Sequence, residues 1–105
     1  MIANRRRLPD RRASETLALE IAGQRFSATV SRFDDGRLGE IFIDMPKAGS
    51  DLAIAARDLA IVFSVALQHG ASADVIRRAL TRNRDGAAAG PLGCVLDLLA
   101  TENSL

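Results

Sequence analysis

The sequence predicts an α+β fold in which a three-stranded antiparallel meander is followed by three helices. Between residues 16 and 44, apolar side chains recur at every second position, which is the period of half-buried strands, and turn signals separate the runs. From residue 51 onward, apolar side chains recur with helical spacing, and Ser50, Ser72 and Pro91 stand where helices commonly begin. We expect the long first helix to pack on the sheet.

The three strands are expected at residues 16–21, at 25–31 and from about Arg37 to Asp44. Gly23–Gln24 is expected to form the two-residue turn of the first hairpin. In the third strand, Ile41 and Ile43 point to one face and Phe42 to the other, so its middle is apolar on both faces. We therefore expect the third strand to lie in the centre of the sheet.

The helices are expected at residues 51–69, from Ser72 to about Leu80 and from Pro91 onward, with a polar loop over 81–90. The first is apolar on more sides than one sheet can cover, and its polar residues form a narrow stripe. Most of the core is expected to come from Leu17, Leu19, Ile41, Ile43, Leu52, Leu59, Phe63, Leu96 and Leu99. Uncovered apolar surface usually marks an interface, so we expect a homodimer with Ile54, Ile61 or Val65 near the contact.

A chain of 105 residues is expected to form one domain, over residues 16–100, with a frayed C-terminus over 101–105. Residues 1–15 carry five arginines against Asp10 and Glu15, a net charge of 5 − 2 = +3, and are expected to form a flexible basic arm. Such an arm can contact nucleic acid weakly and without sequence preference, or it can simply be solvated. The arginines concerned are Arg5, Arg6, Arg7, Arg11 and Arg12.

One cysteine, Cys94, and one histidine, His69, cannot supply an ordinary four-ligand zinc site, and no catalytic constellation is visible. We predict no bound metal, no cofactor and no enzymatic activity. His69 is expected to interact with a helix C-terminus, Cys94 to pack as a small apolar residue, and Glu40 to pair with an arginine. No signal peptide or membrane-spanning run is apparent, so a cytoplasmic location is expected.

Two places could bind an anion. Lys47, Gly49 and Ser50 precede the long helix, where free amide groups and a lysine can hold a phosphate, although an ordinary turn with an N-cap is the simpler explanation of these residues. Farther along the chain, positive charge gathers at Arg78, Arg82 and Arg84, within the region Arg77–Arg84. These arginines could form an anion-binding edge or only a solvated, charged face.

The runs Asp35–Asp44 (DGRLGEIFID) and Ala66–Gly70 (ALQHG), with Lys47, Gly49 and Ser50 between them, resemble the TSCPD domain. This domain lies near the C-terminus of adenosylcobalamin-dependent ribonucleotide reductases. The resemblance covers about residues 24–100. The stretch from Ala79 to Leu99 is similar to the tails of short stand-alone TSCPD proteins of bacteria.

The Thr-Ser-Cys-Pro-Asp motif that names the domain is absent, as is the CxxC pair that lies beyond the domain in the reductases. The resemblance therefore brings no catalytic residue to this chain. It implies a non-catalytic accessory or protein-interaction module, with a ribonucleotide reductase or a related protein as partner. The alternative is a nucleic-acid- or nucleotide-binding protein that uses the basic arm and the Arg77–Arg84 region.

Overall fold

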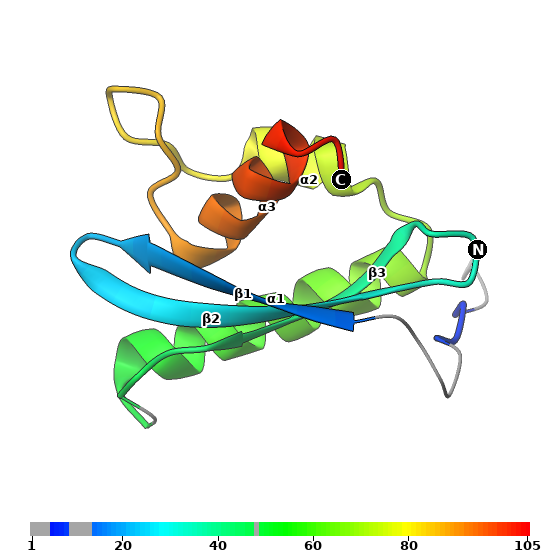
Figure 1. Ribbon diagram of the computed structural model, residues 1–105, viewed down its shortest axis with the longest axis horizontal. Helices are drawn as coiled ribbons and strands as arrows, with labels where there is room; N and C mark the ends of the chain where they lie inside the picture. The colour runs from blue at the N-terminus through cyan, green and yellow to red at the C-terminus, as the bar shows by residue number, and fades with distance from the viewer. Residues whose placement is uncertain (1–4, 9–13, 48) are drawn as a thin grey trace.

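The computed structural model describes residues 5–8, 14–47 and 49–105, and it confirms the α+β fold. Three strands form one antiparallel sheet, and three helices follow along the chain (Figure 1). The elements are β1 (Ser14–Ile21), β2 (Gln24–Arg32), β3 (Leu38–Asp44), α1 (Asp51–Gln68), α2 (Ala73–Ala79) and α3 (Pro91–Thr101).

The sheet differs from the prediction in its first turn and in its central strand. The first turn is Ala22–Gly23, one residue earlier than expected, and both residues have positive φ, as the tight turns that suit a right-twisted hairpin require. The strand order is β1-β2-β3, so β2 is central and β3 is an edge strand. The prediction of a central third strand was wrong because α1, rather than a neighbouring strand, covers the outer edge of β3.

One face of the sheet packs against α1 and α3 to form the core. In the register, Ala28 on β2 lies beside Leu17 of β1 and Ile43 of β3, so apolar side chains of all three strands share this face. Along the sheet, α1 packs on β3 and α3 approaches β1 (Figure 1). The fully buried side chains of α3 are Leu92, Val95, Leu96 and Leu99.

The predicted core is partly corrected. Ile41, Ile43, Phe63, Leu96 and Leu99 are buried as expected, and Leu17 and Leu19 pack against the cluster while half-buried. Leu52 and Leu59, in contrast, are exposed on α1. The helix is rotated so that its small and polar residues, rather than these two leucines, contact the sheet.

Parts of both chain ends have defined positions. The main-chain N–H of Arg6 donates to the Gln68 carbonyl at 2.6 Å, and Arg32 donates to the Ser104 carbonyl at 2.7 Å. The side chain of Leu105 packs against the core. Residues 1–4 and 9–13 of the expected flexible arm lie outside the described residues, so its flexibility stays a prediction. The fraying of residues 101–105 also stays a prediction.

Candidate interaction surface

The contact between α1 and β3 runs through two buried polar side chains of the helix. Ser64 Oγ accepts from the Ile41 main-chain N–H at 2.9 Å and lies 3.1 Å from the Ile41 carbonyl. One turn farther on, Gln68 Nε2 donates to the Gly39 carbonyl at 3.2 Å. These bonds satisfy main-chain groups of an edge strand, which would otherwise lack partners away from water.

Small side chains allow α1 to approach the sheet closely. The buried face of the helix consists of three alanines, Ala53, Ala56 and Ala60, with Phe63 and Leu67 toward its end. The Ser50 side chain caps the helix by accepting from Ala53 N–H at 3.2 Å. Of the polar residues of α1, Ser64 and Gln68 face inward with the alanines, whereas Arg57 and Asp58 are exposed. This orientation turns the larger aliphatic residues away from the sheet.

The opposite side of α1 is an exposed aliphatic surface, which we call the α1 outer face. Val62, near its middle, is 64% exposed, and the other members are between 39% and 50% exposed. Burying exposed aliphatic side chains in a contact that excludes water is favourable, and a surface rich in them is typical of binding sites. The exposed carboxylate of Asp58, four residues before Val62, interrupts this surface. The α1 outer face consists of Leu52, Ile54, Leu59, Ile61, Val62 and Val65.

Beside the α1 outer face, the solvent side of β3 adds an aromatic ring. Phe42 is exposed, and the guanidinium of Arg57 lies 5.1 Å from the centre of its ring. A hollow of about 360 Å³ lies between this part of the sheet and the C-terminal half of α1, with Arg5, Phe42 and Ile61 in its wall. The apolar surface thus continues from the helix onto the sheet.

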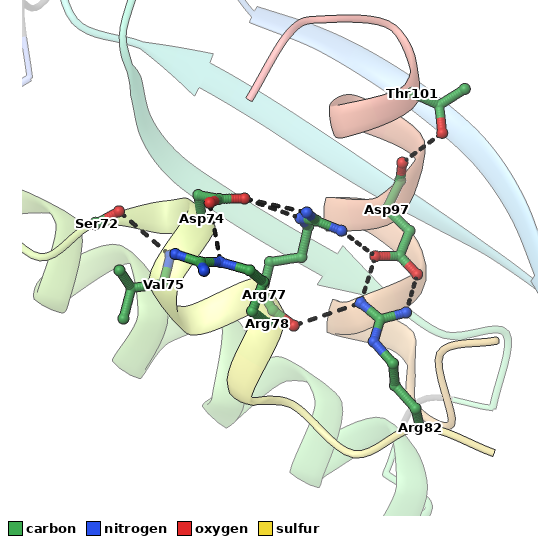
Figure 2. A network of polar contacts seen from close by, with 8 residues as sticks. All are labelled: Ser72, Asp74, Val75, Arg77, Arg78, Arg82, Asp97 and Thr101. Carbon is green, nitrogen blue, oxygen red and sulfur yellow. Dashed lines mark hydrogen bonds and ion pairs between the residues drawn. The ribbon is translucent and has the colours of Figure 1, made fainter. Parts of the chain in front are cut away.

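Asp97 on α3 is the centre of a separate polar network, which Figure 2 shows. Arg82 binds this carboxylate with two nitrogens, at 2.6 and 2.7 Å, and Arg77 approaches it at 3.2 Å. The Arg82 guanidinium lowers the pKa of Asp97 below its ordinary value, and burial only partly opposes this effect. The Arg82–Asp97 contact attaches the loop after α2 to α3, and Arg82 also donates to the Gly86 carbonyl within that loop.

Two of the three arginines of the second candidate anion site, Arg78 and Arg82, contact carboxylates in the structure. Arg82 is matched by Asp97, Arg78 is paired with Asp74 at 3.1 Å, and Arg84 is exposed on the loop. The guanidinium groups of Arg77 and Arg82 thus already contact carboxylates. Anion binding at Arg78, Arg82 and Arg84 stays a prediction.

Lys47 and Ser50 line a hollow of about 370 Å³ at the N-terminus of α1. Arg25 of β2, which the sequence analysis did not single out, lies in the same wall with Met45, Pro46 and Leu52. Gly49 has a φ of +87°, a conformation that glycine adopts without strain. The hollow brings two basic side chains together, and anion binding there also stays a prediction.

The remaining candidate residues are His69, Cys94 and Glu40, and the structure describes the surroundings of each. His69 is the C-cap residue of α1, and its Nδ1 lies 2.9 Å from the Val65 carbonyl oxygen. Cys94 is half-buried against the core, and burial raises the pKa of its thiol. Glu40 is half-buried on β3 and lines the same hollow as Arg5.

Within the described residues, no helix is both long and apolar enough to cross a bilayer. Over the same part of the chain, no three histidine, cysteine, aspartate or glutamate side chains come together as metal ligands would.

Comparison with known proteins identifies the lineage of this fold. The sequence profile of the TSCPD domain matches residues 4–102. The chain belongs to the TSCPD domain family. The match includes all six elements of the structure, from β1 to α3, which confirms the resemblance inferred from the strand and helix motifs.

Similar curated proteins are much longer than this chain. A vitamin B12-dependent ribonucleotide reductase of Bradyrhizobium diazoefficiens is 38% identical over 84 residues, which are 80% of this chain and 7% of the reductase. Reductases of the same name from Agrobacterium fabrum and Rhodopirellula baltica are 39% identical over 66 residues and 38% identical over 80 residues. They cover 63% and 76% of this chain, which in turn spans 5% and 8% of their length. No solved structure matches the chain significantly.

Proposed function

We propose that this TSCPD domain protein is a non-catalytic accessory module that acts by binding another protein through the α1 outer face. The observation that carries the proposal is the orientation of α1, which buries Ser64 and Gln68 and exposes six large aliphatic side chains on one helix. A helix that needed only to complete its own domain would place its large aliphatic residues inward. Such a surface gains free energy when a partner covers it.

The partner class that we favour is a ribonucleotide reductase or a related protein. The support is the similarity of this chain to a small part of vitamin B12-dependent ribonucleotide reductases. A domain that resembles one part of a large enzyme is suited to contact such an enzyme or its relatives. We place the protein in the cytoplasm as part of this proposal.

Nucleic-acid or nucleotide binding has less support. Arg77 and Arg82 contact Asp97, and Arg6 contacts Asp34 and Asp35, so the charges of these three arginines are locally neutralised. The guanidinium of Arg6 also lies 4.0 Å from the centre of the Phe33 ring. Arg11 and Arg12 of the arm lie outside the described residues.

Affinity capture with two matched variants tests the proposal. Val62→Asp places a charge in the middle of the α1 outer face, whereas Val75→Asp places one at a 57% exposed valine of α2. We expect wild type and Val75→Asp to capture the same defined protein from native lysate in stoichiometric amount, and Val62→Asp to lose it. Equal capture by both variants would contradict binding through the α1 outer face, and recovery of nucleic acid alone would favour the alternative.

A further inference from the structure

Residues 5–8, the described part of the basic arm, lie against the body of the protein beside the C-terminal end of α1 (Figure 1). The main-chain N–H of Arg6 donates to the Gln68 carbonyl, and Arg5 Nε donates to Gln68 Oε1, both at 2.6 Å. An arm that is only solvated makes no such bonds to the domain. We call residues 5–8 the strap.

The turn between β2 and β3 holds the Arg6 side chain. One guanidinium nitrogen lies 3.1 Å from Asp34 Oδ1 and 3.0 Å from Asp35 Oδ2, and the group lies 4.0 Å from the centre of the Phe33 ring. Asp35 Oδ1 accepts from the Arg37 main-chain N–H at 3.0 Å, so the turn itself positions this carboxylate. The two carboxylates offer Arg6 charged oxygen acceptors, as the phosphates of a nucleic acid would.

The last residue of the strap adds an apolar contact. Leu8 is half-buried and lies over Gly39 of β3. A methyl group at position 39 would come within 2.6 Å of Leu8 Cδ2 and 3.3 Å of the Phe33 ring. The absence of a side chain at Gly39 therefore gives the leucine its place on the sheet.

The ionic part of this attachment is weak enough to be reversible. The Arg6 side chain is 42% exposed and that of Asp34 is 85% exposed, so water and salt screen the contact between them. Arg7 is exposed and makes no hydrogen bond or ion pair with another described residue. Docking thus engages Arg5 and Arg6 and leaves Arg7 available.

We infer that the strap is an autoinhibitory contact, in which the acidic β2–β3 turn keeps Arg6 from the phosphate groups of nucleic acid. Release of the strap presents Arg5, Arg6 and Arg7 as consecutive cations, and such a run binds phosphate chains without sequence preference. Docking and nucleic-acid binding then oppose each other, and each weakens the other by the same factor. The inference is independent of the α1 outer face, and it accounts for a basic arm on a module that we propose to bind protein.

Hydrogen exchange of single amides, measured by NMR, tests the docking. The Arg6 N–H is bonded to Gln68 and the Arg7 N–H has no such bond, so in wild type the Arg6 amide should be slowed at least about tenfold more, relative to its intrinsic rate. Leu8→Ala removes the apolar contact without changing charge and should abolish most of this difference. Val75→Ala, at an exposed valine of α2, is the control and should preserve it. Equal protection of the Arg6 and Arg7 amides in wild type would overturn the docking.

Titration with fluorescently labelled poly(dT) tests the inhibition. Leu8→Ala should bind it at least about threefold more tightly than wild type or Val75→Ala, because the binding-competent state is more populated. The slope of log affinity against log salt concentration should steepen by about 0.7 for each arginine that gains a phosphate. Adding poly(dT) to wild type should in turn speed the exchange of the Arg6 amide.

A second variant reaches the same contact from the sheet. Gly39→Ala displaces Leu8, also without a change of charge, and replaces Leu8→Ala if circular dichroism shows that Leu8→Ala is unfolded. A folded variant that frees the Arg6 amide but keeps the wild-type affinity and salt dependence for poly(dT) would overturn the inhibition. Failure of wild type and both variants to bind poly(dT) would overturn it as well.

Discussion

The Ser64 hydroxyl of α1 and the main chain of Ile41 in β3 are joined by contacts of 2.9 and 3.1 Å, which attach the helix to the edge of the sheet. The hydroxyl also lies 2.8 Å from the Ala60 carbonyl of its own helix. This relationship fixes the rotation of α1 about its axis. It therefore decides which side chains of α1 are buried and which form the α1 outer face.

Ser64→Ala should destabilise the protein by about 1–3 kcal/mol, because it leaves the buried Ile41 N–H without its acceptor. Equilibrium unfolding in urea measures this loss. Ser27→Ala, at a half-buried serine of β2, is the matched control and should change the free energy of unfolding by less than about 0.5 kcal/mol. Equal effects of the two substitutions would contradict the role of Ser64 at the sheet edge.

Two alanine substitutions compare the buried side of α1 with its exposed side: Phe63→Ala and Leu59→Ala. Phe63 is 2% exposed and its truncation should cost about 3–5 kcal/mol, since it leaves a cavity in the core. Leu59 is 42% exposed, so its truncation in the dissociated protein should cost less than about 1 kcal/mol. Urea melts at low protein concentration measure both, and the reverse order would mean that the helix is rotated differently.

Asp97→Asn should lower stability at neutral pH by about 1 kcal/mol, because the carboxylate that Arg82 and Arg77 bind loses its charge. The lowered pKa of Asp97 means that this contribution is present above its ordinary value of 3.8 and is lost as the pH falls toward the lowered value. The melting temperature of wild type should therefore fall more steeply than that of Asp97→Asn below about pH 4.

The control for this prediction is Glu102→Gln, which removes an exposed carboxylate just after α3. It should leave the pH dependence close to that of wild type. If the melting temperatures of wild type and Asp97→Asn fell by the same amount between pH 6 and pH 3, the Arg82–Asp97 contact would not stabilise the fold.

The sequence predicted the bounds of the strands and helices more accurately than the face that each of them buries. Alternation in Leu17, Leu19 and Ile21 and the cap at Ser50 are local signals, and they gave strands and helices close to the observed bounds. The position of β3 at the edge was missed because a strand apolar on both faces is usually central. What covers its edge here is the next element of the chain, the helix α1, through Ser64.

The rotation of α1 could have been inferred from Ser64 and Gln68. They are four residues apart on one side of the helix, beside the alanines at positions 56 and 60. Small and polar residues on one side suit close contact with main-chain groups of a strand. Hydrophobicity alone placed Leu52 and Leu59 in the core, because it does not distinguish an intrachain core from a surface for a partner.

The most direct measurement of the binding role of the α1 outer face is the isoleucine methyl NMR spectrum. It is recorded once for the dilute protein alone and once with the partner present. The partner is either a second copy, supplied by raising the concentration, or the captured protein. Ile54 and Ile61 belong to the face, whereas Ile41 and Ile43 are buried in the core. We predict large shifts of the Ile54 and Ile61 methyl signals with little change at Ile41 and Ile43; unchanged Ile54 and Ile61 signals in a demonstrably bound protein would contradict the account.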